Sequence, residues 1–226
     1  MIDIPLWRLS LMLIPLAIVG LVMWKWSGGV ADLLISTGRM VVQLLAVGYF
    51  LVFLFESEAW WLHFLVVLFM VGVSAAIAIR TVKSDRLPAY RDALLSIGLG
   101  GGGVFTLVLF AVLGMRSFEA RYAIPIAGMI FANAMTAVTL AAERFEAEKA
   151  NGKAGENARV VAWNASLIPQ INSFLAVGLV SLPGMMTGQI LAGASPLDAV
   201  RYQIMVMAMV MGSAGISVFI FLRKRS

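Results

Sequence analysis

Apolar residues form long unbroken blocks along this chain and do not alternate with polar residues as they would in half-buried strands. A helix needs about 20 mostly apolar residues to cross the hydrocarbon core of a membrane. Blocks near that length predict about seven spanning helices, at residues 9–26, 40–55, 60–79, 94–113, 123–142, 160–182 and 203–222. The second block is short, and the amphipathic residues 31–39 before it can extend the helix. The pattern predicts an all-α, polytopic membrane protein with a single transmembrane domain over residues 1–226.

Composition indicates the same class of protein. Hydrophobic residues make up 61% of the chain, charged residues 13%, and the mean hydropathy is +0.94, whereas soluble domains have about 45–50% apolar and about 25% charged residues. The net charge of +5 is scattered over short loops, which argues against a nucleic-acid partner. Because the chain has no Cys, disulfides and thiolate metal sites are excluded. The first block lacks a cationic start, so we expect a retained helix and not a signal peptide.

The distribution of Lys and Arg predicts the orientation, because short cytoplasmic loops carry an excess of these residues. If the C-terminus is cytoplasmic, 13 of the 17 basic residues fall in inside segments. These segments are residues 25–39, 80–91, 144–159 and 223–225. We therefore predict that the N-terminus lies outside and the C-terminus in the cytoplasm.

Residues 165–207 are too apolar for a loop and too rich in Pro, Gly, Asn and Gln for an ordinary membrane anchor. Pro169 and Pro183 interrupt the helical pattern, and Gly184 and Gly188 follow closely. Broken backbone at membrane depth is tolerated only where protein or a water-filled cavity covers it. We interpret these four residues as a backbone break within a transport pathway.

Polar residues within the spans are concentrated in the same region. A polar side chain at membrane depth costs free energy, so it indicates either a functional role or a hydrogen bond between helices. Such a hydrogen bond is worth about 0.6 kcal/mol on average. The polar residues in or beside the predicted spans are Gln43, Asn133, Asn164, Gln170, Asn172, Ser173, Gln189 and Gln203. No Asp or Glu lies at the centre of a span, which disfavours proton or sodium coupling and carboxylate ligation of a hard cation. Met185 and Met186 could offer thioether ligands to a softer metal, or they could simply fill space.

The glycine-rich run at residues 98–103 lies inside an apolar span, and no Gly-Lys-Ser/Thr follows it. It therefore lacks the pattern of a phosphate-binding P-loop. We interpret it as a helix-packing surface or a flexible point. Since the chain has no P-loop, any dependence on ATP must come from another subunit.

Three blocks of residues resemble a known family of permeases. They are Gly38-Arg39 with Gln43-Leu44 and Gly48-Tyr49; PIAGMI and NAM at residues 125–130 and 133–135; and the long run of residues 177–193 and 195–206. On these residues the chain resembles the permease subunit of the FetB/YbbM-type ABC transporters. Members of that family are described as bacterial iron exporters, with plant relatives linked to aluminium tolerance.

The resemblance implies a non-enzymatic permease subunit of the inner (cytoplasmic) membrane that forms a homodimer or hetero-oligomer. It implies ATP-driven export of an iron-like metal ion or a small solute, with ATP and Mg²⁺ bound by a separate P-loop subunit and no cofactor bound by this chain. We expect the pathway to use Gln43, Asn133, Gln170, Asn172, Met185 and Met186. We expect the ATPase to dock near Arg39, Arg144, Lys149, Lys153 and Arg159. A metal-binding set cannot be assigned from the sequence.

Two departures from the family pattern favour an alternative function. The cytoplasmic segment at residues 143–159 lacks the family's Leu-Gly-Ala-Thr-Pro-like motif, and Asn172 and Leu175 replace an acid and a base. The alternative is a divergent, non-transporting subunit with a structural or assembly role in a larger membrane complex. A stand-alone channel or secondary carrier is less favoured, because nothing titratable lines the spans.

Overall fold

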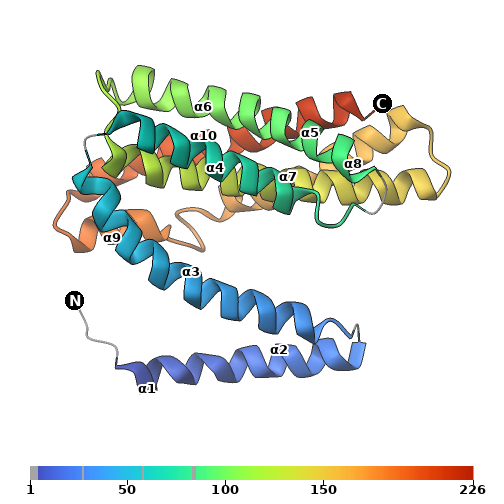
Figure 1. The fold of residues 1–226 in the computed structure, drawn as a ribbon, viewed down its shortest axis with the longest axis horizontal. Helices are drawn as coiled ribbons and strands as arrows, with labels where there is room; N and C mark the ends of the chain where they lie inside the picture. Colours follow the sequence, from blue (N-terminus) through green and yellow to red (C-terminus); the bar gives the residue numbers. More distant parts are fainter. Residues whose placement is uncertain (1–4, 27, 58, 83–84, 226) are drawn as a thin grey trace. The chain divides into compact units, whose positions relative to one another are not determined.

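The computed structural model describes residues 5–26, 28–57, 59–82 and 85–225 (Figure 1). Helices make up nearly all of this described chain, which contains no β-strand, only one isolated bridge between Val177 and Ser181. The helices form two compact units, residues 1–58 and 59–226, each described here by itself. The predicted all-α, polytopic fold is confirmed.

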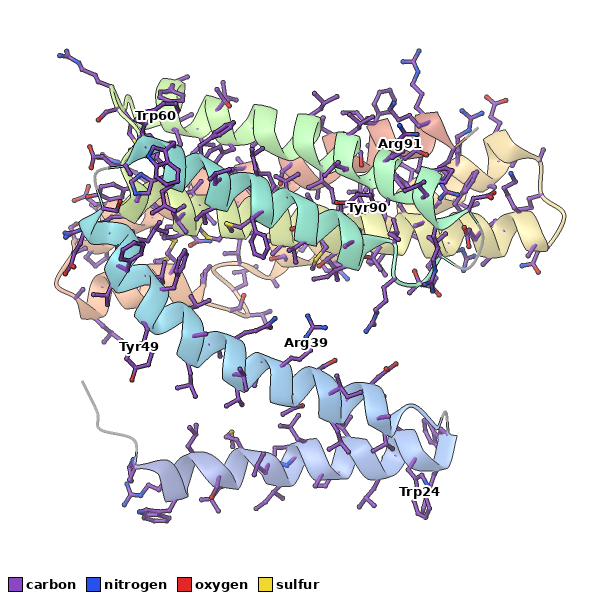
Figure 2. All side chains as sticks on the ribbon, in the orientation of Figure 1. Trp24, Arg39, Tyr49, Trp60, Tyr90 and Arg91 are labelled. Carbon is purple, nitrogen blue, oxygen red and sulfur yellow. The ribbon has the colours of Figure 1, made fainter. Side chains whose placement is uncertain are left out.

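The first unit is a pair of packed helices. Its elements are α1 (Leu6–Leu9), η1 (Ser10–Met12), α2 (Leu13–Trp26) and α3 (Val30–Glu56). Gly28, at a φ of +69°, makes the turn between α2 and α3. Apolar side chains cover both helices and are largely exposed, as Trp24 and Tyr49 show in Figure 2. Because α3 begins at Val30, the predicted extension of the second span through residues 31–39 is confirmed.

The second unit is a bundle built around one long central helix, α7. Its elements are α4 (Trp60–Ala78), α5 (Arg86–Ser96), η2 (Ile97–Gly101), α6 (Gly102–Thr106), η3 (Leu107–Val112), α7 (Ala120–Ala150), α8 (Gly155–Ala176), α9 (Gly184–Leu191) and α10 (Pro196–Lys224). The elements from α5 to η3 form one continuous span, of which η2 and η3 are π-helical. α7 packs against α4, α8 and α10 and carries the most buried residues of any of these elements. The core of the bundle therefore follows α7.

Within the described residues, six helical segments are both long enough and apolar enough to cross a membrane. They are Trp7–Trp26, Val30–Glu56, Trp60–Ala78, Arg86–Val112, Ala120–Ala150 and Pro196–Lys224. The remaining expected span, at residues 160–182, corresponds to α8. Its 22 residues would extend about 33 Å, which is long enough to cross the hydrocarbon core. However, α8 contains Glu156, Arg159 and several amide side chains, so it is less apolar than the other six segments. The number of clearly apolar spans is thus six and not seven.

Several loops that were assigned to the cytoplasm meet at one end of the second unit, which we call the charged end. Arg225, just after α10, lies 3.8 Å from Asp92 of α5 and 3.7 Å from Glu146 of α7. The turn from α7 to α8 and the C-terminus lie at this same end (Figure 1), and Arg91 is on α5 close by (Figure 2). Three of the four predicted inside segments therefore share one end of the bundle. The orientation in the membrane stays a prediction.

The glycine-rich run is a packing surface. A Cβ on Gly100 would lie 2.6 Å from Ser217 Oγ and 2.7 Å from the Ser217 backbone nitrogen, so η2 and α10 touch backbone to backbone there. A Cβ on Gly101 would lie 3.0 Å from the ring of Phe131 on α7. Small residues allow such close approach of helices in a membrane. The interpretation as a packing surface is confirmed for Gly100 and Gly101, whereas a Cβ on Gly102 or Gly103 would have nothing within 4 Å.

We predict that Gly100→Ala destabilises the protein by about 1–3 kcal/mol, because the added methyl group meets backbone that cannot rotate away. Gly103→Ala is the matched control, since a Cβ at that helical position has nothing within 4 Å. It should leave stability unchanged or raise it by up to about 1 kcal/mol. Unfolding of the purified variants in mixed micelles measures both. Equal stability of the two variants would contradict the contact between η2 and α10.

Candidate functional site

The predicted break in the helical backbone lies between α8 and α9. α8 ends at Ala176, and Gly178 adopts a φ of +81° that only glycine takes without strain. Residues 177–183 form an irregular loop, and Pro183 directly precedes the first residue of α9. The break therefore falls before Pro183 and not within the residues that follow it.

The other three residues assigned to the break lie inside helices, so that part of the prediction differs from the structure. Gly184 and Gly188 belong to α9, and Pro169 lies within α8. A proline in a helix interior removes one backbone hydrogen bond. α8 continues through Pro169 because Ser166 and Gln170 on either side are buried against the bundle.

A polar cavity of about 250 Å³ lies among α7, α8 and α10. Its lining residues are Asn133, Thr136, Pro169, Gln170, Ser173, Phe174, Met207 and Val210. We call it the amide cavity, after the two amide side chains that it contains. The structure thus brings together three of the residues predicted from sequence, namely Asn133, Gln170 and Pro169.

Gln170 has the least satisfied side chain of the amide cavity. It is only 5% exposed, and its Oε1 atom accepts no hydrogen bond from the described residues. By contrast, Asn133 Nδ2 donates to the Met129 carbonyl oxygen at 2.8 Å, and Thr136 Oγ1 donates to the Ala132 carbonyl oxygen at 2.9 Å. An unsatisfied buried acceptor costs about 1–3 kcal/mol. Such a group in a native structure calls for an explanation, and a polar ligand or water is one.

A second cavity of about 390 Å³ adjoins the first and is largely apolar. Its lining residues are Phe174, Val177, Gly178, Leu182, Pro183, Met186, Val200, Gln203, Ile204, Met207 and Ala208. Phe174 and Met207 line both cavities, so these two side chains separate them. Along α10 the lining runs from Val200 to Val210, which places both cavities in the half of the bundle away from the charged end.

Several predicted pathway residues lie outside both cavities. Gln43 is exposed on α3 in the first unit, and Met185 on α9 lines neither cavity. Asn172 and Leu175, where the family has an acid and a base, are both exposed on α8. Their positions are one turn apart on the outer side of the helix. The loss of that charged pair therefore leaves the lining of the amide cavity unchanged.

Five lining residues of the amide cavity were not predicted as site residues: Thr136, Ser173, Phe174, Met207 and Val210, of which Ser173 was named only among the polar residues of the spans. Helical spacing could have found two of them, because Thr136 follows Asn133 by three residues and Ser173 follows Gln170 by three. Phe174 and Met207 carry no such signal, since apolar residues are common throughout these helices.

At the charged end, a buried carboxylate in the last turn of α7 pairs with two basic side chains. Glu148 is 4% exposed and lies 2.5 Å from Arg144 and 2.6 Å from Lys153. The backbone makes a Schellman cap here: Gly152 takes a φ of +80°, the Gly152 N–H donates to the Lys149 carbonyl oxygen, and the Lys153 N–H donates to that of Glu148. The cap fixes the turn that leads from α7 into α8.

The ion pairs also affect the predicted docking residues. α7 is about 46 Å long, so this polar end extends beyond a hydrocarbon core of about 30 Å. The hydrogen bond from Lys153, together with the charge of Arg144, holds the pKa of Glu148 below its usual range. Arg144 and Lys153 therefore share the single carboxylate of Glu148, and Arg144, Lys149 and Lys153 are all exposed. Arg159 lies on α8 and Arg39 on α3 of the first unit.

Among the described residues, no three His, Asp or Glu side chains are grouped closely enough to hold a metal ion together. The donors that the amide cavity offers are amide and hydroxyl oxygens and the thioether of Met207. These are weak neutral ligands, which suit transient contact with a solute better than a tightly held ion.

Comparison with known proteins agrees with this architecture. The family described as "Uncharacterised protein family (UPF0014)" matches residues 6–225. The chain is 33% identical to the UPF0014 membrane protein slr1647 of Synechocystis, over 86% of this chain and 82% of the relative. It is 36% identical to the probable iron export permease protein FetB of Escherichia coli, over 84% of this chain and 78% of the relative. It is 34% identical to the protein ALUMINUM SENSITIVE 3 of Arabidopsis thaliana, over 82% of this chain and 72% of the relative.

No solved structure matches the chain. The family match covers almost every residue, and the relatives share a third of their residues with the chain over most of their length. The helical, apolar fold is that of a multi-pass membrane protein. The chain therefore belongs to the UPF0014 family of membrane proteins.

Proposed function

We propose that this chain is the membrane-spanning permease subunit of an ATP-driven exporter in a bacterial-type inner membrane. The observation that carries the proposal is its 36% identity to a probable iron export permease across most of both chains. The chain has no P-loop motif of its own, so the energy comes from a separate ATP-binding subunit. The cargo is an iron-like metal ion or a small solute.

The amide cavity and the adjoining apolar cavity form part of the path in this proposal. A pathway site must bind its cargo well enough to admit it and weakly enough to release it. Neutral oxygens of Asn133, Gln170 and Ser173, with the soft sulfur of Met207, meet that requirement. Phe174 and Met207 are apolar and stand between the two cavities, so their rotation would open or close the connection.

In this proposal, the movement that ATP hydrolysis causes in the ATPase is transmitted to the path from the charged end. The Schellman cap and the two ion pairs of Glu148 make the turn from α7 to α8 a well-fixed element. α7 carries Asn133 and α8 carries Gln170, so a push on this turn would move both walls of the amide cavity. Lys149 and the rest of the turn are exposed for contact with an ATPase. Coupling in this form does not require the docking motif that relatives carry.

We predict that the chain co-purifies with a P-loop ATPase encoded beside it, and that metal efflux from reconstituted vesicles requires both proteins and ATP. An ATPase variant without its P-loop lysine is the control and should bind the permease without driving efflux. Efflux by the permease alone, or efflux driven by a proton or sodium gradient, would contradict the proposal.

We predict that Gln170→Met lowers ATP-driven efflux by about fivefold, since one lost hydrogen bond to cargo is worth about 1 kcal/mol. The free energy of unfolding should stay the same or rise by about 1 kcal/mol. Met has a volume similar to that of Gln, and the substitution removes a buried oxygen that has no hydrogen bond. Efflux and thermal unfolding in the same preparation measure the two effects.

Gln189→Met is the matched control for this experiment. Gln189 Oε1 is also buried without a hydrogen bond among the described residues, but Gln189 lines neither cavity. Its variant should keep full efflux. If both variants lost efflux equally, or if only Gln189→Met did, the amide cavity would not be the path.

A further inference from the structure

A third concavity, the arginine groove, lies between α8 and α10 in the half of the bundle near the charged end. It has a volume of about 380 Å³. The lining residues are Arg159, Val160, Trp163, Phe219, Leu222 and Arg223. None of them lines the amide cavity or its apolar neighbour. The transport path therefore does not account for this groove.

Aromatic and aliphatic side chains form the walls of the arginine groove. The rings of Trp163 and Phe219 meet edge to face, with centroids 6.5 Å apart and planes at 87°. A Cβ on Gly215 would lie 3.9 Å from the Trp163 ring, so the indole rests against bare backbone of α10. Val160 and Phe219 remain 55% and 54% exposed, which opens the groove to the outside of the bundle. An apolar chain lying in it would contact rings on one side and surrounding lipid on the other.

The positive charges stand at one end of the same groove. Arg159 is in the second turn of α8 and Arg223 in the last turn of α10, which brings two guanidinium groups to the charged end. Arg159 Nε donates to the Gly155 carbonyl oxygen at 3.3 Å, and this holds the side chain along its helix. No acidic residue lines the groove among the described residues. Trp163 follows Arg159 by one helical turn on α8, and tryptophans are enriched near the charged ends of membrane helices.

We propose that the arginine groove binds an anionic phospholipid from the membrane leaflet at the charged end. Its phosphate contacts Arg159 and Arg223, since guanidinium groups match phosphate oxygens in geometry and charge. One acyl chain follows the apolar wall formed by Trp163 and Phe219. A cationic end joined to an apolar trough fits an amphiphile better than it fits a soluble anion or a purely apolar helix, and basic pockets between membrane helices bind lipid head groups in this way.

Native mass spectrometry of the purified protein, titrated with phosphatidylglycerol and separately with phosphatidylcholine, tests the proposal. The unmodified protein should favour phosphatidylglycerol by about tenfold or more, in line with two basic groups near a lipid phosphate. Arg159→Gln combined with Arg223→Gln should abolish this preference. Lys149→Gln removes one positive charge at the same end but outside the groove, and should keep the preference.

Val160→Trp provides a second test that retains both arginines. The larger side chain at this exposed position fills the groove, so binding of phosphatidylglycerol should weaken by about tenfold. If the double arginine variant fails to fold, Val160→Trp and Arg159→Gln alone carry the test. Three results would overturn the proposal: no preference in the unmodified protein, the same loss in Lys149→Gln, or displacement of the lipid by millimolar glycerol phosphate. Each outcome is independent of ATP-driven efflux.

Discussion

Inside a lipid bilayer no water is present to satisfy a polar group, and this constraint governs nearly every feature of the chain. Backbone amides are satisfied within helices. Side-chain hydroxyls on α7 bond to carbonyl oxygens one turn back, as Thr136 and Thr139 do at 2.9 and 2.8 Å. Gln170 Oε1 has no such partner among the described residues, whereas Asn133 and Thr136 in the same cavity do. The proposed function assigns this oxygen a role in binding the cargo.

Packing in the second unit keeps this polar site in place. α7 lies at the centre, η2 approaches α10 without intervening side chains at Gly100, and Arg225 joins α10 to α5 and α7 at the charged end. These contacts hold α7 and α10, two of the three helices that line the amide cavity. The loop of residues 177–183 borders the apolar cavity; its Gly178 N–H donates to the Ser181 carbonyl oxygen, and its Leu179 and Val180 side chains are exposed. In the proposed function, the half of the bundle away from the charged end contains the path.

The sequence predicted the helical membrane fold well, because apolar blocks of spanning length have a direct physical meaning. It predicted a break near Pro183, and the structure has one at residues 177–183, where Gly178 takes a positive φ and Pro183 directly precedes α9. Asn133 and Gln170 were found because buried amides are costly. Met207 and Phe174 were missed because packing and pathway residues look alike in an apolar helix. The pairing of Arg144 and Lys153 with Glu148 could not be foreseen, since it depends on the cap geometry.

Access of water to the amide cavity is the most direct measure of whether it is a path. The chain has no native cysteine, so one introduced thiol can be followed alone. Ser173→Cys lies in the cavity, whereas Ile171→Cys lies on the same helix outside both cavities. In membranes, a water-soluble thiol reagent should modify Ser173→Cys rapidly, cargo or ATPase turnover should change that rate, and Ile171→Cys should stay unmodified. Protection of Ser173→Cys under all conditions, or equal reaction at both positions, would contradict a transport path through this cavity.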